Sequence, residues 1–356
     1  MNGSPVDIVV FAPLAPILCV ILFWFIQLLF IESQRYLLDK IRPKHKPLCR
    51  FTNFLGILFQ TICHALGYTV TKSGISDIYL SINYGRVAPK KERKGIFEWI
   101  ANAFLFIGPF FIPAGLLLIC LFFLLNNGFE ITTPSELLKV KYTFGGQMIT
   151  FGTSLYLFSK NLYGFLLNID LLHPGHFGFL LLMIFLGMGI RPSYIGEQKI
   201  DRVDMMYDLR NIWSLIKHKP MYVVILFSIA YIFFYISLLL TKDWYISLFI
   251  IFGWLSIISI SSLMITHFII LLIKNVDEIP DNKKYLPYIT LPASYISMRI
   301  LFLYIPTSFK YSISLLVMIC STIVVTLFLN NKFKTREKIK LLKKTKNTGE
   351  EKRDEQ

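Results

Sequence analysis

The sequence predicts an all-α polytopic membrane protein with about seven transmembrane helices, a re-entrant semi-polar segment and a short strand-like stretch. Of the 356 residues, 54% are hydrophobic and only 17% are charged, and the mean hydropathy is +0.57. A soluble domain carries roughly a quarter charged residues. The apolar residues here form blocks long enough to cross a bilayer, which takes about 20 residues as a helix. These observations exclude a secreted or cytosolic globular enzyme, a disordered chain and a nucleic-acid-binding domain.

The net charge of +15 orients the chain. Residues 32–50 hold six Lys or Arg against two acids, residues 86–94 five against one, and residues 330–356 ten against five. Each stretch borders an apolar block, which is the positive-inside pattern. We therefore expect an integral protein of the cell membrane, with its N-terminus outside and its C-terminus in the cytoplasm.

The same charges define the expected partners. No aromatic residues interleave with a folded basic patch, so we expect no nucleic acid. The basic tail at 330–356 is expected to lie against anionic lipid headgroups. The other expected partners are the lipid bilayer and a membrane protein.

The first span is expected at residues 8–31, and it is long enough to be retained rather than removed as a signal peptide. Residues 51–70 are apolar but contain polar side chains, among them His64, and residues 71–85 alternate with a strand-like period. Basic stretches lie on both sides of this segment, which predicts that it enters the membrane and returns. Non-helical backbone at that depth must be buried in protein or line a wet cavity.

Six further apolar blocks predict the remaining spans. They cover residues 97–125, 177–190, 221–241, 244–273, 285–306 and 311–329. The first of these contains Pro109 and Pro113, which kink a helix and free carbonyls for other partners. The weak block at 285–306 contains Arg299, which we expect to pair with an acid or to reach toward the interface.

Three shorter segments lie between the spans. Thr133-Pro134-Ser135-Glu136 has the form of a capping box and predicts the start of a short helix. Residues 147–172 are moderately apolar but contain Asp170, so they span weakly or lie at the interface. Residues 201–219 predict a surface-lying amphipathic helix that ends at Pro220, with Asp208 outside its apolar stripe. The stripe consists of Met205, Leu209, Ile212 and Ile216.

A resemblance enters at Cys63-His64-Ala65-Leu66-Gly67-Tyr68. This segment resembles the H-E-x-G-H helix of intramembrane zinc metallopeptidases of the site-2 protease type. The order of a semi-polar helix, a strand-like stretch and a span with Ile107-Gly108-Pro109 is also similar to the core of that family, at about residues 50–200. The chain from residue 220 on resembles no family.

The resemblance implies a pseudoenzyme. In the family, two His four residues apart bind zinc and the Glu beside the first His acts as general base. His64 occupies the position of the first zinc ligand. Ala65 stands where the family has the Glu, and Tyr68 stands where the family has the second His. The nearest positions for the third, acidic ligand are Asp201 and Asp204. We therefore name no catalytic residue and expect no cofactor, with zinc only if a rearranged site is active.

Three functions stay open. The favoured one is a non-catalytic relative of these peptidases that holds a partner helix or a lipid in a polar intramembrane pocket. Its pocket residues are His64, Tyr68, Asn102 and Pro109.

The second is an active metal-dependent membrane hydrolase with a rearranged site, in which the metal ligands are His64 with His173, His176 or Asp201. The third is a transporter of a small solute or a lipid. Apart from Glu98 at the end of one span, the clear spans contain no intramembrane carboxylate that could couple to ions, which counts against transport.

The chain is expected to divide into three regions. Residues 1–219 form an N-terminal membrane region that includes the peptidase-like core at about 50–200. Residues 220–329 form the C-terminal transmembrane helices, and residues 330–356 form a basic, disordered cytoplasmic tail.

Overall fold

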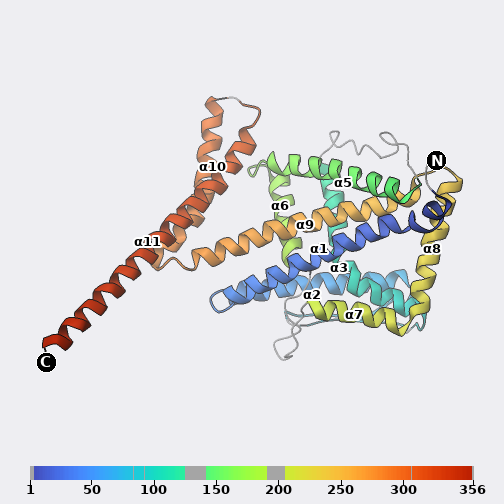
Figure 1. The fold of residues 1–356 in the computed structure, drawn as a ribbon, viewed down its shortest axis with the longest axis horizontal. Helices are drawn as coiled ribbons and strands as arrows, with labels where there is room; N and C mark the ends of the chain where they lie inside the picture. Colours follow the sequence, from blue (N-terminus) through green and yellow to red (C-terminus); the bar gives the residue numbers. More distant parts are fainter. Residues whose placement is uncertain are drawn as a thin grey trace. The chain divides into compact units, whose positions relative to one another are not determined.

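The computed structural model describes residues 4–82, 84–91, 93–124, 142–190, 205–305 and 307–354. These residues form two compact units (Figure 1). The first unit comprises Met1–Gly164 and Leu171–His267, and the second comprises Phe165–Asp170 and Phe268–Gln356. The predicted helix start at Thr133-Pro134-Ser135-Glu136 lies outside the described residues, as do Asp201 and Asp204.

Helices make up most of the first unit. They are η1 (Asp7–Phe11), α1 (Leu14–Ile41), α2 (Lys46–Val70), α3 (Ile96–Leu124), α5 (Phe144–Leu167), α6 (Pro174–Gly189), α7 (Met205–His218), α8 (Pro220–Leu239) and α9 (Trp244–Val276), with α5 and α9 ending in the second unit. An antiparallel hairpin of β1 (Ile75–Leu80) and β2 (Gly85–Pro89) separates α2 from α3. This hairpin confirms the predicted strand-like stretch.

The described residues contain six helices long and apolar enough to cross a membrane. They are α1, α3, α8, α9, the segment Asn282–Tyr304 and the segment Lys310–Phe333. Six of the seven predicted spans, and the all-α polytopic membrane class, are confirmed. The block at 177–190 instead forms α6, a 16-residue helix, which is shorter than the roughly 20 residues a crossing takes. The segment predicted to re-enter the membrane forms α2 and the hairpin, and α2 is not among the six.

Helices α1 and α9 run side by side in the same direction. At their beginnings, the Tyr245 hydroxyl of α9 donates to the carbonyl oxygen of Pro13. Further along, both meet α6, because Gln34 Nε2 donates to the Gly187 carbonyl oxygen at 3.0 Å and Gly187 lies directly against the Ser262 backbone. These contacts fix the register of three helices.

Helices α3 and α5 complete the core of the first unit. The Trp24 ring of α1 meets the Phe110 ring of α3 edge-on at 6.0 Å, and Ser259 Oγ of α9 donates to the Phe110 carbonyl oxygen at 2.9 Å. On α5, Phe158 stacks on Trp254 of α9 at 5.2 Å. Small hydroxyl side chains on α9 allow this close approach of helices. Those that are buried are Ser256, Ser259, Ser261, Ser262 and Thr266.

Helix α7 differs from its prediction in one respect. Asp208, which lies outside the apolar stripe, is fully buried. Its carboxylate pairs with the Arg35 guanidinium of α1 at 3.6 Å, and Arg35 also contacts Glu32 at 3.4 Å. The Glu32 carboxylate accepts from the Met205 backbone N–H at the start of α7. An acid excluded from the apolar stripe is buried here because α1 supplies its counter-ion.

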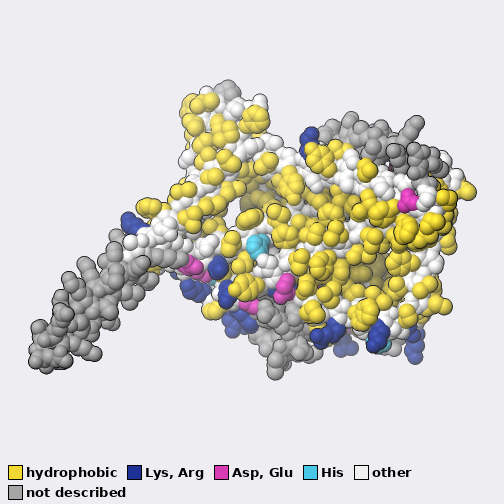
Figure 2. Space-filling model, in the orientation of Figure 1, with side chains coloured by type: hydrophobic (Ala, Val, Ile, Leu, Met, Phe, Trp, Pro, Cys, Tyr) yellow, Lys and Arg dark blue, Asp and Glu magenta, His cyan; other side chains and the backbone are white. Residues whose placement is uncertain are grey.

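Charged side chains follow one edge of the unit. In Figure 2, Lys and Arg gather along the lower edge of the view, over α2 and α7, and hydrophobic side chains cover most of the face above them. This separation fits a protein whose apolar face contacts lipid and whose basic edge lies at the membrane surface.

The second unit contains η2 (Asp281–Tyr285), α10 (Leu286–Tyr304) and α11 (Lys310–Asp354), packed against the segment 165–170. Asp170 accepts a hydrogen bond from the Tyr295 hydroxyl at 3.1 Å and one from Arg299 Nη2 at 3.2 Å. The Arg299 guanidinium also lies 4.4 Å from the ring centre of Tyr311. The expected pairing of Arg299 with an acid is confirmed.

Helix α11 continues into the basic tail. We predict disorder over 330–356, whereas α11 continues as a helix to Asp354. The tail is rich in Lys and Glu, which have high intrinsic helix propensity.

Candidate functional site

The site that the sequence singles out lies at the end of α2. There Ser73 N–H donates to the Tyr68 carbonyl oxygen at 2.9 Å and Lys72 N–H donates to that of Thr69 at 3.0 Å. This is the Schellman pattern, with Lys72 in the left-handed region at φ 52° and Gly74 at φ 67° two residues later. The chain therefore reverses within a few residues, and the hairpin folds back along α2.

The hairpin covers one face of α2. Asn53 Nδ2 donates to the Ile82 carbonyl oxygen at 3.2 Å. A Cβ added at Gly85 would lie 2.7 Å from Ile57 Cγ2 and would also meet the Thr61 hydroxyl, so only glycine allows this approach. Residues three or four apart share a helix face. His64 follows Thr61 by three residues and therefore lies on the side of α2 that carries the hairpin.

The structure brings His64 and Tyr68 together on that face. Their ring centres are 4.5 Å apart with an angle of 32° between the planes. His64 Nε2 is buried and has no hydrogen-bond partner among the described residues. Burial lowers the pKa of His64, so the neutral imidazole is the form present at pH 7. A neutral imidazole beside a phenol can accept or donate a single proton or hydrogen bond.

Among the described residues, His64 lacks the further ligands that a zinc ion needs. Structural and catalytic zinc sites use three or four His, Cys, Asp or Glu ligands. On α2, His64 is followed by the methyl group of Ala65 and by Tyr68 at the second ligand position. Across the described residues, no group of three such side chains lies close enough to hold a metal ion. No reaction step through zinc follows from this arrangement.

Pro109 and Asn102 have different surroundings on α3. Pro109 is buried next to Gly108, whose added Cβ would lie 3.0 Å from Cys63 Cβ. Thus α3 touches α2 one residue before His64, at the helix crossing. Asn102 instead lines a cavity of about 340 Å³ between α3 and α7, whose lining does not include His64 or Tyr68.

The His173 and His176 pair has a structural role at the start of α6. His173 is the N-cap residue, and its Nδ1 accepts from the His176 backbone N–H at 3.4 Å. The two rings lie 4.6 Å apart. This is the cap that a helix with Pro174 at its first position needs.

The cavity between α3 and α7 went unnoticed in the sequence. Its polar lining combines Glu98 and Asn102 of α3 with residues of α7 and the residue that precedes α8. The available signal was the spacing of Asn211, Ser214 and His218, which places three polar side chains on one face of a helix.

Comparisons with family models, with curated proteins and with solved structures found no match to this chain.

Proposed function

We propose that this multi-pass membrane protein is a non-catalytic relative of site-2-type peptidases that holds a partner helix beside α2 and the hairpin. The observation that carries the proposal is the environment of His64. Its imidazole packs against the Tyr68 ring, its buried Nε2 has no hydrogen-bond partner within the described part of the chain, and the neighbouring Ala65 offers no group that could take a proton from water. A polar group kept there without a base or further ligands suits binding better than hydrolysis.

The packing of α2 against α3 supports the resemblance. The two helices are antiparallel and cross closely, since a Cβ added at Gly67 would lie 3.2 Å from the Ala101 Cα. At the other end of the crossing Gly108 meets Cys63. Small residues at both points hold the helix with His64 against the helix with the Gly-Pro pair. The order of helix, hairpin and Gly-Pro helix is that of the family the motif resembles.

The hairpin supplies a docking edge for the partner. Within the described chain, β1 pairs only with β2, which leaves backbone groups on its other edge. Two large side chains of β1 are exposed, Ile78 at 54% and Tyr79 at 55%. An extended segment that leads into a partner helix can add to such an edge as a further strand. Apolar exposed side chains beside the edge favour a membrane-embedded partner.

The metal content of the purified full-length protein tests the first half of the proposal. We expect the wild-type protein to contain no zinc bound by His64, so its zinc content should equal that of the His64→Ala variant. Near-stoichiometric zinc that disappears in His64→Ala would overturn the proposal and favour the metal-dependent hydrolase.

A double substitution tests the peptidase-like geometry. Ala65→Glu with Tyr68→His restores the motif, and we expect it to create zinc affinity because two imidazoles one turn apart share a helix face. The matched control is Ala65→Gln with Tyr68→Phe, which adds similar volume without a ligand. Zinc affinity that is equal in the two double variants would refute the geometry.

Cross-linking tests the partner. A photoreactive side chain at Ile78 is expected to join the protein to an apolar polypeptide segment, identified by mass spectrometry. The same probe at Leu303, an 80% exposed residue of α10, serves as the lipid-facing control. Lipid adducts alone at both positions would refute a partner helix at the hairpin.

A further inference from the structure

The cavity between α3 and α7 has the chemistry of a ligand site. Its volume is about 340 Å³, and it lies where α3 begins and α7 ends. Among its lining residues are Glu98, Trp99, Asn102, Asn211, His218 and Lys219. It therefore contains cationic, anionic and neutral polar groups in one hollow.

Internal contacts fix the walls of this cavity. Trp99 Nε1 donates to the Leu215 carbonyl oxygen at 3.2 Å, which ties α3 to α7. His218 Nδ1 is held by the Ser214 carbonyl oxygen at 2.8 Å and by the Ser214 hydroxyl at 3.1 Å. The other ring nitrogen of His218, Nε2, is then the one that a ligand can reach. The site is preorganised on three elements.

One donor in the lining lacks an acceptor. Asn211 Nδ2 is buried without a hydrogen-bond partner among the described residues, and a buried amide N–H without an acceptor is unfavourable. Together with the Lys219 ammonium, it offers donors to an oxyanion such as phosphate. Glu98 supplies a carboxylate in the same cavity, which suits an ammonium group.

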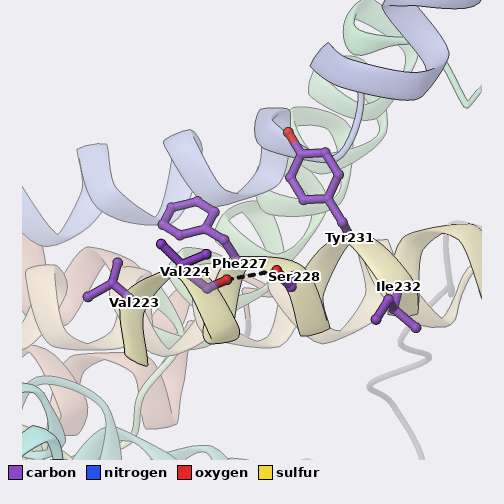
Figure 3. A pocket seen from close by; sticks show the side chains of 6 residues that line it. All are labelled: Val223, Val224, Phe227, Ser228, Tyr231 and Ile232. Atoms are coloured by element: carbon purple, nitrogen blue, oxygen red, sulfur yellow. Dashed lines mark hydrogen bonds between the residues drawn. The ribbon is translucent and has the colours of Figure 1, made fainter. Parts of the chain in front are cut away.

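An apolar groove begins one turn further along α8. Its volume is about 520 Å³, and Figure 3 shows the Phe227 and Tyr231 rings on the same side of the helix. The other lining residues are Val223, Val224, Ser228 and Ile232. Lys219, which lines the cavity, is the N-cap residue of α8, so the groove begins four residues further along the chain.

The groove has the length of one lipid leaflet. From Val223 to Ile232 the helix rises about 14 Å at 1.5 Å per residue, and half of a 30 Å hydrocarbon core is about 15 Å. Ser228 Oγ donates to the Val224 carbonyl oxygen of its own helix at 2.9 Å, so the groove offers little to a polar ligand. At the far end, the Tyr231 hydroxyl donates to the Val10 carbonyl oxygen at 2.8 Å and joins α8 to η1.

We infer that the cavity and the groove form one binding site for a phospholipid whose headgroup carries a phosphate and a primary ammonium. Lys219 and Asn211 bind the phosphate, Glu98 binds the ammonium, and one acyl chain lies along α8. The placement agrees with membrane chemistry, since the cavity lies at the end of a span beside the basic stretch 86–94 and contains an indole, which favours the interface. This site lies on other elements than the hairpin and does not depend on the proposed function.

Native mass spectrometry of the full chain in detergent tests the site, with phosphatidylethanolamine, phosphatidylglycerol and phosphatidylcholine of identical acyl chains as probes. The wild-type protein is expected to retain one phosphatidylethanolamine more tightly than either of the other lipids. Lys219→Gln should weaken both phosphatidylethanolamine and phosphatidylglycerol about tenfold, the loss expected for one charge-assisted hydrogen bond. Lys217→Gln, an exposed lysine outside the cavity, is the control and should change nothing.

Two further variants separate the headgroup from the chain. Glu98→Gln should lower the affinity for phosphatidylethanolamine to that for phosphatidylglycerol and leave phosphatidylglycerol binding unchanged. Val224→Trp fills the groove and should reduce retention of all three lipids, whereas Ile225→Trp on the neighbouring face should not. The side chains of Val224 and Ile225 are 58% and 38% exposed, so neither substitution disturbs the core.

Three outcomes would overturn the inference. Equal retention of the three lipids by the wild-type protein would mean ordinary annular lipid. Unchanged binding in Lys219→Gln would remove the phosphate site. Inorganic phosphate that competes fully with phosphatidylethanolamine, together with unchanged binding in Val224→Trp, would indicate a site for a free anion.

Discussion

Replacing Gly187 with Ala is expected to destabilise the first unit at the junction of α1, α6 and α9. A Cβ at this position would lie 2.7 Å from the Ser262 carbonyl carbon and closer still to its oxygen. Ordinary carbon contacts begin near 3.4 Å. The obstacle is helix backbone, which cannot rotate away as a flexible side chain can. Either α6 or α9 must shift, and the hydrogen bond from Gln34 to the Gly187 carbonyl must follow.

The magnitude can be bracketed with a control in the same helix. Gly178 of α6 has open space within 4 Å of an added Cβ. Gly178→Ala therefore gains only the helix propensity of alanine, about 0.8–1.0 kcal/mol. Gly187→Ala gains the same amount but also overpacks the junction, which costs about 1–3 kcal/mol. The two alanine variants should thus differ by about 1–3 kcal/mol in the free energy of unfolding, roughly tenfold in equilibrium constant for each 1.4 kcal/mol.

Reversible unfolding in mixed detergent micelles, followed by circular dichroism, measures this difference. Gly178→Ala is expected to be the most stable protein, followed by the wild type and then by Gly187→Ala. If overpacking costs only its lower bound, the wild type and Gly187→Ala should be about equally stable. Equal stabilisation by both substitutions would refute the close packing of α6 on α9. Gly187→Ala with a stability above that of the wild type would refute it as well.

The remaining predictions concern other parts of the chain. Arg299→Leu leaves the Asp170 carboxylate, of which 17% is exposed, without its counter-ion and should cost about 3 kcal/mol in detergent unfolding; adding Asp170→Asn should recover part of the loss, and a double variant less stable than Arg299→Leu would contradict the pairing. Truncation after Thr335 should leave membrane insertion intact, as tested by alkaline extraction, and a protein that fails to insert would contradict the view that the tail is dispensable. Cys49 should react slowly with a maleimide at pH 7, because its side chain is 5% exposed and burial raises its pKa; labelling as fast as in the detergent-unfolded protein would contradict its burial.

The sequence predicted the fold class and most of the elements because their signals are local. Apolar length determines a span, the alternation within 71–85 marks a strand, and the stripe of α7 marks an amphipathic helix. Asp208 shows where local signals fail. Its position outside the stripe predicts exposure, but its burial depends on Arg35, which is more than 170 residues away in the chain. The block at 177–190 was predicted as a span from its apolar composition, although it is shorter than the roughly 20 residues that a crossing takes.

The candidate site could be predicted only in part for the same reason. His64 and Tyr68 lie one turn apart on one helix, so their proximity follows from the sequence. Asn102 was grouped with them because it lies on the next helix, yet α3 turns it toward α7 and the cavity found there. A cavity between two helices depends on their crossing, and a single sequence does not contain that information.

The pair of Asp170 and Arg299 has a consequence for the synthesis of this protein in the membrane. An Arg within a span opposes insertion by about 2.5–3.5 kcal/mol, and α10 contains Arg299. Asp170 leaves the ribosome 129 residues before Arg299. Asp170 is therefore already synthesised when α10 reaches the bilayer, and its carboxylate can pair with Arg299 as α10 inserts. A chain in which the two residues were exchanged would present the arginine first, with no partner yet made.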